Sequence, residues 1–435
     1  MKATVQEPAP CRRAIQIEVP AEEVRAEIDR TSRRFAKGVA LPGFRKGQAP
    51  PALVRRRYQR EIEGEAIEHL THDLTWKVIE EHKIHPLHQP VVEEARYREG
   101  EPLSFRATFE IRPSFTLGVY RGLAAERRLP PVTDGEVERH VAEVRERRAR
   151  LDAIEGRPLA LGDVGVLDLQ RLDAAGLPDG EPRLGVHVEV TETGAPSELR
   201  AALLGATVGE DREVTLTPAE GAPGPEGVAP APDRYRVTLR ALRLKVLPAL
   251  DDELAKEIGL DNLGQLREQI RADLERRVAE RAAEEVREAI LRQMVEAHPF
   301  PLPDLLVRQE QTHLLEMMVA SLARQGVDPN KLDWDWDARR TEMREPAERR
   351  VRVDLLLDAV AVQEGFEVPE TEVVAALRQE AERSHTALPV LRARLEREGR
   401  LEVLKLKMLR AKSLDLIVRS ANITDNLSPQ AGERA

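Results

Sequence analysis

Cysteine is almost absent from this 435-residue chain, and so are long apolar runs. Cys11 is the only cysteine, which excludes an internal disulfide and a zinc site built from several thiolates. No apolar run approaches the ~20 residues of a membrane-spanning helix, and the first residues lack the apolar stretch of a signal peptide. These absences predict a cytoplasmic protein with no membrane partner.

Aromatic residues are also scarce, at 3% of the chain, whereas charged residues make up 33%. Large apolar side chains are therefore few, and the cores must consist mainly of Leu, Val, Ile and Ala. A chain of this length is expected to form several domains, and we expect three. The composition favours elongated helical pieces over one compact globule.

Motifs for common enzyme chemistry are missing as well. The sequence contains no Gly-x-x-x-x-Gly-Lys, no Gly-x-Gly-x-x-Gly and no nucleophile elbow, so we expect no cofactor, no ATP-driven cycle and no hydrolase activity. A group of histidines lies between residues 69 and 88, without a cysteine and without the His-Glu-x-x-His order. The members are His69, His72, His82, His85 and His88. We interpret them as surface histidines and predict no metal site.

The clearest positive signal is a turn-forming segment, Leu41 to Pro50, between two helical patterns. Its glycines and prolines predict an exposed tip. The surrounding stretch from Arg30 to Arg60 contains no Asp or Glu, although the whole chain has a formal charge of -10. Its basic residues are Arg30, Arg33, Arg34, Lys37, Arg45, Lys46, Arg55, Arg56, Arg57 and Arg60. A local basic surface on an acidic protein indicates a polyanionic partner, because clustered Lys and Arg attract phosphates.

An N-terminal α+β domain is expected over residues 1–113. Ile15, Ile17 and Val19 alternate with polar residues, which is typical of a half-buried strand. The predicted elements are this strand, helices over about 20–37 and 51–84, and a hairpin of strands over 91–97 and 103–111.

The rest of the chain changes character twice. The expected parts are a linker with a connecting helix (114–160), a small β-rich domain (161–246), an elongated all-α domain (247–425) and a disordered tail (426–435). Thr133 and Glu136 have the spacing of a capping box at the start of the connecting helix. The low-complexity insert 218–232 is predicted to be a flexible loop. The fold class is therefore multidomain α+β.

Several C-terminal helices have apolar residues on wide faces. The segment around residues 305–322 contains Leu314, Leu315, Met317, Met318 and Leu322, and we expect part of this surface to remain open. Trp334 and Trp336 follow among Asp333, Asp335 and Asp337. These rings could grip apolar segments, but we favour a role in anchoring the loop on neighbouring helices.

With its parts in this order, the chain resembles trigger factor, a family of ribosome-associated bacterial chaperones, over about residues 12–425. The most specific match is Gly43 to Gly47 with Pro50, which is similar to the family's Gly-Phe-Arg-Lys-Gly-Lys-x-Pro signature. Gln48 replaces the final Lys. Two further segments, 300–303 and 349–357, look like landmarks of the family's C-terminal domain.

The resemblance implies a site at the ribosomal tunnel exit. The implied site residues are Gly43, Phe44, Arg45, Lys46 and Gly47, with Phe44, Arg45 and Lys46 in contact with ribosomal protein and 23S rRNA. We expect the site to tolerate Gln48, because Arg55, Arg56 and Arg57 remain nearby.

The resemblance also implies nascent polypeptides as clients and allows a homodimer off the ribosome. The candidate client-binding residues are Leu314, Leu315, Met317, Met318 and Leu322. Flexible Leu and Met side chains adapt to many sequences, so the contacts should be weak and reversible.

Residues 162–245 resemble the family's FKBP-type peptidyl-prolyl isomerase domain. Gly162 to Asp168 look like its opening Gly-Asp-x-Val-x-Ile-Asp, and Gly205 to Glu210 look like its Gly-x-x-x-Gly-Glu turn. Such a domain seats proline among aromatic rings, yet Tyr235 is the sole aromatic residue between 151 and 250. Either Asp168 and Tyr235 serve a weak isomerase, or the domain is a degenerate spacer that contacts clients.

We therefore predict an ATP-independent, ribosome-associated chaperone that holds new polypeptides open for folding and export. The alternatives are a protein that is primarily a prolyl isomerase and a holdase that does not bind ribosomes. A purely RNA-binding protein would need stacking aromatics near the basic residues, where only Phe44 and Tyr58 qualify. A periplasmic chaperone-isomerase would need a signal peptide.

Overall fold

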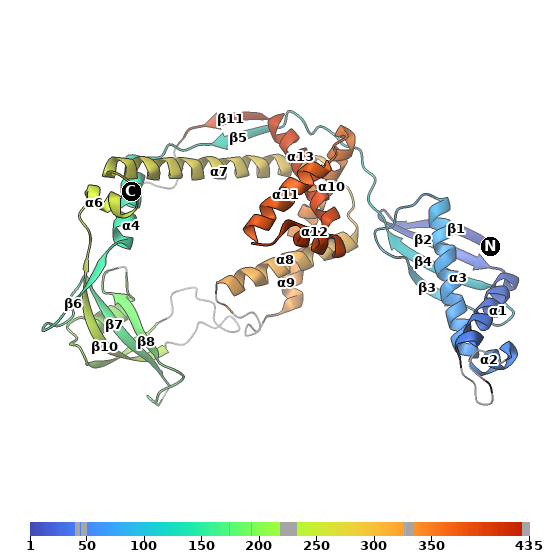
Figure 1. Cartoon of the computed structure of the whole chain (residues 1–435), viewed down its shortest axis with the longest axis horizontal. Coiled ribbons are helices and arrows are strands. Elements are labelled where there is room, and N and C mark those ends of the chain that lie inside the picture. Colours follow the sequence, from blue (N-terminus) through green and yellow to red (C-terminus); the bar gives the residue numbers. More distant parts are fainter. Residues whose placement is uncertain are drawn as a thin grey trace. The chain divides into compact units, whose positions relative to one another are not determined.

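The computed structural model (Figure 1) describes residues 1–39, 44, 50–173, 175–192, 194–217, 233–325, 327 and 334–428. The chain divides into two units. Met1–Arg127 and Ala283–Asp425 form the first, which contains the N-terminal α+β domain and most of the helical domain. Arg128–Ala282, with the residues from Asn426 onward, form the second, which contains the β-rich domain. The mixed α and β architecture predicted from the sequence is confirmed, while the insert 218–232 and the tail from residue 429 lie outside the described residues.

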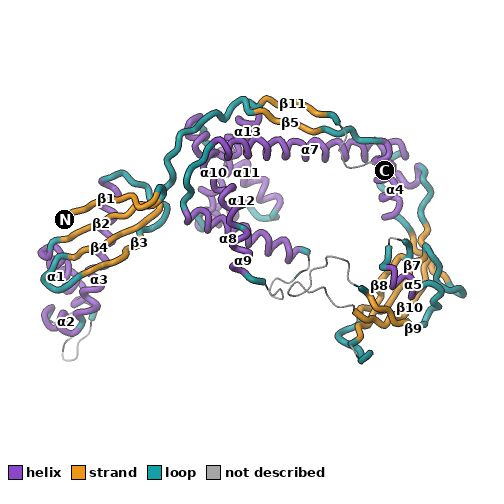
Figure 2. The backbone as a smooth tube through the Cα atoms, turned by 180° about the vertical axis from the view of Figure 1, so that it is seen from behind, coloured by secondary structure: helices purple, strands orange, loops and turns teal. Residues whose placement is uncertain are grey.

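The N-terminal domain is a four-stranded antiparallel sheet with helices packed on one face (Figure 2). Its elements are β1 (Lys2–Ala9), β2 (Arg12–Val19), α1 (Ala21–Gly38), α2 (Pro51–Arg57), α3 (Gln59–Glu81), β3 (Val91–Arg96) and β4 (Leu103–Glu110), and the strand order is β1-β2-β4-β3. The alternation of Ile15, Ile17 and Val19 places all three on the buried face. There they pack with Phe105 and Phe109 against α1 and α3.

Two features of this domain differ from the prediction. β1 was not expected, because its sequence has no apolar alternation and its side chains are mostly exposed at the sheet edge. The single helix predicted over 51–84 is divided at Tyr58, whose φ of -116° and ψ of 34° end α2 and begin α3. The Tyr58 ring packs on Phe35 with ring centroids 5.4 Å apart, which fixes this break against the core.

Residues 112–127 lie along the helical domain, and we call this segment the strap. Tyr120 is buried in the helical core, and Phe115 stacks on Phe300 with ring centroids 4.1 Å apart. The backbone N–H of Gly118 donates to His298 Nε2 over 2.7 Å. Near its end, β5 (Ala124–Arg128) pairs with β11 (Asn422–Asn426). The sequence grouped most of the strap with the linker, but its apolar side chains are part of the helical core.

The C-terminal region is helical, as predicted. Its helices are α7 (Leu263–Ala297), α8 (Asp304–Arg324), α9 (Trp336–Glu342), α10 (Arg344–Glu364), α11 (Glu370–Arg383), α12 (Leu388–Arg397) and α13 (Arg400–Arg419). Ile290 of α7, Leu356 and Val360 of α10 and Ile417 of α13 form the centre of the core. A smaller apolar cluster joins α11, α12 and α13.

The middle domain is β-rich, also as predicted. Its elements, with the flanking helices, are α4 (Asp134–Arg147), β6 (Arg150–Ile154), β7 (Asp163–Leu172), β8 (Arg183–Glu189), α5 (Ser197–Leu203), β9 (Asp211–Leu216), β10 (Asp233–Val246) and α6 (Asp252–Glu257). The long strand β10 pairs with β7 on one side, and with β9 and β6 on the other. The predicted capping box of α4 is present, with the Thr133 hydroxyl accepting from Glu136 N and the Glu136 carboxylate accepting from Thr133 N.

In the part of the chain that the structure describes, no helix combines the length and the apolar character that a bilayer-spanning segment requires.

Candidate functional site

The connection between α1 and α2 is the first candidate site. α1 ends at Gly38 and α2 begins at Pro51, so two helices fix the ends of the predicted tip. Phe44 is described and is 42% exposed, a large apolar ring left open to a partner. The other predicted site residues, Gly43, Arg45, Lys46 and Gly47, lie outside the described residues.

Some of the basic residues around this connection are neutralised by carboxylates from outside the acid-free stretch. The ion pairs are Arg30–Glu27 (2.8 Å), Arg34–Glu65 (2.7 Å) and Arg55–Asp29 (2.8 Å). Arg30–Glu27 lies within α1, whereas the pairs with Asp29 of α1 and Glu65 of α3 depend on the packing of the helices. The acid-free sequence therefore overstated the free positive charge.

Other basic residues from the same three helices remain exposed and, among the described residues, have no anionic partner. We call them the free cations: Arg33, Lys37, Arg56, Arg57 and Arg60. α2 has basic residues throughout its last turn, where a positive charge also complements the helix dipole. Unpaired guanidinium and ammonium groups at one end of a domain are suited to bind phosphate groups, because no internal pair has to be broken first.

Tyr58 does not contribute an open ring to this surface. It is half-buried and packs on Phe35 as part of the domain core. Of the two stacking candidates, Phe44 is exposed and Tyr58 is not. This arrangement favours contact with a phosphate backbone over stacking on several bases.

The second candidate site is the C-terminal half of α8. The N-terminal half buries Val307 and Gln311, but the five predicted client-binding residues belong to none of the apolar clusters that the described residues form. We call them the α8 face: Leu314, Leu315, Met317, Met318 and Leu322. Met317 is 48% exposed and the other four are half-buried. α8 thus presents apolar side chains that the described part of the fold covers only in part.

The third candidate pair, Asp168 and Tyr235, does not converge. In the β7–β10 register Asp168 is opposite Thr238, whereas Tyr235 is opposite Arg171. Because successive side chains alternate between the faces of a sheet, Asp168 and Tyr235 emerge on opposite faces. Tyr235 packs against the domain core. The structure does not bring the two residues together.

Asp168 is also occupied by internal contacts. Its carboxylate accepts hydrogen bonds from Arg240 Nε over 2.5 Å and from the backbone N–H of Gly185 over 2.9 Å. The hydrogen bond from Arg240 holds the pKa of Asp168 below its ordinary value. The Asp168 carboxylate therefore belongs to a structural ion pair on the polar face of the sheet and does not line an apolar proline pocket.

The sequence matches to an isomerase domain lie at positions that shape the fold. Gly162 has φ +93° directly before β7, and Gly205 and Gly209 have φ +76° and +89° around a turn, a conformation that favours glycine. Asp163 is buried and accepts two hydrogen bonds from Arg157, at 2.6 and 2.7 Å. These residues explain why the domain folds without implying a reaction.

Two groups of candidates from the sequence remain, the tryptophans near residue 335 and the histidines between residues 69 and 88. Trp334 and Trp336 pack on each other with ring centroids 5.6 Å apart, and the guanidinium of Arg339 in α9 lies 5.6 Å from the centroid of the Trp334 ring. Trp336 is exposed, and the favoured anchoring role stays a prediction. Among the described residues, no group of His, Cys, Asp and Glu has the arrangement of a metal site. His88 instead accepts from the backbone N–H of Glu110 over 3.2 Å.

One feature was missed from the sequence. A charged groove of about 970 Å³ lies on the helical domain, lined by residues of α7, α8, α9, α10 and α13. Its residues are scattered over more than one hundred positions and share no motif, so only the packing of the helices reveals it.

Comparison with known proteins gives a consistent result. Residues 1–144 match the family described as bacterial trigger factor protein (TF), and residues 262–419 match its C-terminal family. Trigger factor of Anaeromyxobacter sp. (strain Fw109-5) is 32% identical over 97% of this chain and 99% of the relative. Trigger factor of Solibacter usitatus is 30% identical, covering 95% and 98%. A solved structure reported for promiscuous substrate recognition by the trigger factor chaperone has the same fold, with 20% identity, coverage of 96% and 99%, and a TM-score of 0.51.

Proposed function

The chain belongs to the trigger factor family of ribosome-associated chaperones that assist folding, and we propose that it docks on ribosomal RNA through its N-terminal tip and holds nascent chains on the α8 face. The observation that carries the docking proposal is the set of free cations around the exposed Phe44. We place the protein in the cytoplasm, where ribosomes and nascent chains are both present.

Electrostatics supports an RNA partner at the tip. Each phosphate that a Lys or Arg neutralises releases condensed counterions, so binding should weaken steeply as salt is raised. The paired residues Arg30, Arg34 and Arg55 have internal carboxylates and contribute less. We assign the main contacts to the free cations and to Phe44, Arg45 and Lys46 of the predicted tip, with the exposed ring of Phe44 in contact with ribosomal protein.

Burial of apolar surface supports client holding on α8. Removing apolar surface from water contributes about 25 cal/mol per Å². Half-buried Leu and Met side chains on one helix offer a modest area, which makes each contact weak and reversible. Reversible contacts allow a client to leave and fold without ATP.

We assign the middle domain to spacing and client contact and not to catalysis. Asp168 and Tyr235 face opposite sides of the sheet, and Asp168 is bound by Arg240. A homodimer off the ribosome remains an expectation of the family, which sedimentation of the free protein would test.

The first experiment is sedimentation of the purified protein with bacterial ribosomes through a sucrose cushion. A variant with Phe44→Ala, Arg45→Ala and Lys46→Ala should no longer pellet. A matched control with Arg30→Ala and Arg34→Ala removes two basic residues that already have carboxylate partners, and it should pellet nearly as the native chain does. Equal pelleting of the triple variant and the native chain would disprove docking through the tip.

A further inference from the structure

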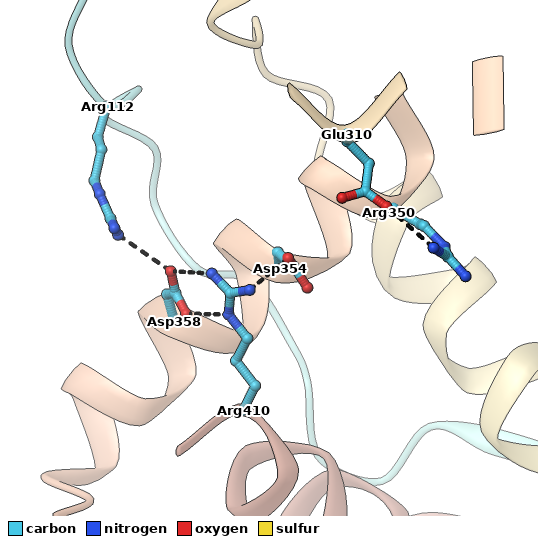
Figure 3. A network of polar contacts seen from close by, with 6 residues as sticks. All are labelled: Arg112, Glu310, Arg350, Asp354, Asp358 and Arg410. Carbon is cyan, nitrogen blue, oxygen red and sulfur yellow. Dashed lines mark hydrogen bonds and ion pairs between the residues drawn. The ribbon is translucent and has the colours of Figure 1, made fainter. Parts of the chain in front are cut away.

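The charged groove is connected to the strap by a chain of ion pairs (Figure 3). Arg410 of α13 binds two carboxylates of α10, Asp354 and Asp358. Its contacts to Asp358 are Nε to Oδ1 at 2.6 Å and one terminal nitrogen to Oδ2 at 3.0 Å. Arg112, the first residue of the strap, donates to the same Asp358 Oδ2 over 3.1 Å.

Only one end of this series of ion pairs faces the groove. Arg410 and Asp354 line it, whereas Asp358 and Arg112 are not among its lining residues. Asp358 is 9% exposed, so its charge must be compensated by the two guanidinium groups that reach it. Arg112 follows directly after the N-terminal sheet, where Ile111 is bound to Cys11 through a backbone hydrogen bond of 2.9 Å. The series of ion pairs thus runs from the groove to the end of β4, where the N-terminal sheet ends.

The groove suits a positively charged group. Carboxylates outnumber Lys and Arg side chains among its lining residues. Burial raises the pKa of Asp354, and the nearby Asp358 and Glu310 add to the effect, so the positive charges of Arg410 and Arg350 compensate this carboxylate incompletely. Asp354 therefore gains from a further cation at the groove surface.

Asp358 couples the two ends because it is shared. While the positive charge of Arg410 compensates both Asp354 and Asp358, the buried Asp358 also requires the positive charge of Arg112. A cation that binds Asp354 leaves Arg410 to compensate Asp358 alone, and the ion pair between Asp358 and Arg112 then stabilises the fold less. The same carboxylate thus cannot hold Arg112 equally well with the groove empty and with it filled.

We propose that a lysine or arginine side chain of a bound polypeptide pairs with Asp354 in the groove and thereby loosens the hold of Asp358 on Arg112 and on the N-terminal domain. This inference rests on the proposed client binding, to which it adds a coupled ionic site. Coupling between two sites is reciprocal. Removing Arg112 must therefore strengthen the binding of a basic peptide.

The test measures the affinity of the full-length protein for a fluorescent, unstructured peptide that combines leucines with one central lysine. Arg112→Ala should bind it about two- to fivefold more tightly than the native chain, the size expected for a partly exposed ion pair. Arg121→Ala is the matched control, because Arg121 is also in the strap, is similarly exposed and binds Glu364 instead (2.6 Å). It should leave the affinity unchanged.

Two further measurements separate coupling from a general effect on the fold. In an Asp354→Asn background the gain from Arg112→Ala should disappear, and a peptide with norleucine in place of lysine should bind the native chain and Arg112→Ala equally. An unchanged affinity in Arg112→Ala, or an equal gain for the norleucine peptide, would overturn the coupling. If neither peptide binds even the native chain, the proposed client binding fails as well.

Discussion

The N-terminal tip and the middle domain both match family motifs, but the fold leaves several charged residues near the tip unpaired and pairs the two aspartates of the middle-domain motif. At the tip, Arg56 and Arg57 project from α2 without an anionic partner among the described residues. In the middle domain, Asp163 and Asp168 are each tied to an arginine, Arg157 and Arg240. A charged group that the fold leaves unpaired is available to a partner, whereas one that the fold has paired serves the fold.

This difference separates two meanings of a motif match. The matches at Gly162, Gly205 and Gly209 reflect backbone angles that a turn requires. The match at Phe44 leaves an apolar ring exposed to solvent, where it adds little to the stability of the domain core. Four variants test how the fold uses these groups.

Asp163→Asn should have the largest effect. It leaves Arg157 without its buried carboxylate partner and should lower the free energy of unfolding of the middle domain by about 2–3 kcal/mol. The hydrogen bonds from Arg157 hold the pKa of Asp163 below its ordinary value. The native contribution is therefore fully present above the ordinary Asp pKa of about 4 and is lost as the pH falls through the lower folded value.

Thermal or urea unfolding, followed by circular dichroism from neutral pH to about pH 3, measures this effect. Asp179→Asn is the control, because the Asp179 side chain forms an exposed 3.7 Å pair with Arg171, and it should change stability by less than about 0.5 kcal/mol. If Asp163→Asn were equally mild, the match at this position would need an explanation other than folding.

Arg56→Gln with Arg57→Gln should weaken ribosome binding by about tenfold, because two direct phosphate contacts are lost. Arg30→Gln with Arg34→Gln changes the net charge equally but removes residues that are already paired, and it should cost only about twofold. Binding measured over a range of salt concentrations should also show a shallower slope for the first variant. Equal losses would mean that net charge, and not the free cations, determines the affinity.

Met317→Glu should reduce client holding by about three- to fivefold, since it places a charge on the α8 face and removes an apolar contact. The measurement is suppression of aggregation of a denatured client at limiting chaperone concentration. Val362→Glu alters an apolar residue of α10 that is 83% exposed and lies outside the α8 face, so it should behave like the native chain. A similar loss in both variants would show that client binding is not localised to α8.

The sequence was sufficient where periodicity or turn chemistry determines structure. The alternation of Ile15, Ile17 and Val19 predicted β2, and the capping box at Thr133 predicted the start of α4. It failed for β1, whose side chains have no apolar alternation because the strand is an exposed edge. The packing of the strap on the helical domain was also hidden, because it depends on partners such as Phe300 that are nearly two hundred residues away.

The candidate sites show the same limit. Sequence reasoning found the basic residues around the tip, but it could not tell Arg34, which is paired with Glu65, from Arg33, which has no anionic partner in the described part of the chain. It proposed Asp168 and Tyr235 as a pair without the strand register that places them on opposite faces. The groove over Asp354 was missed because its residues come from separate helices. Tertiary packing determines which charged residues form ion pairs and which face of the sheet a side chain occupies, and short sequence patterns do not reveal this packing.

The smallest effect is expected for Asp168→Asn in prolyl isomerisation. Refolding of a protein limited by a cis-trans proline step should not accelerate with the native chain at micromolar concentration, and Asp168→Asn or Tyr235→Ala should change nothing. The barrier is about 18–20 kcal/mol, and an isomerase domain of the resembled type lowers it by seating proline among aromatic rings. Asp168 is on the face opposite to the apolar core that Tyr235 contacts. An acceleration by the native chain that Asp168→Asn removes would make the middle domain an enzyme and would end the contrast with the tip, because a paired carboxylate would then be performing chemistry.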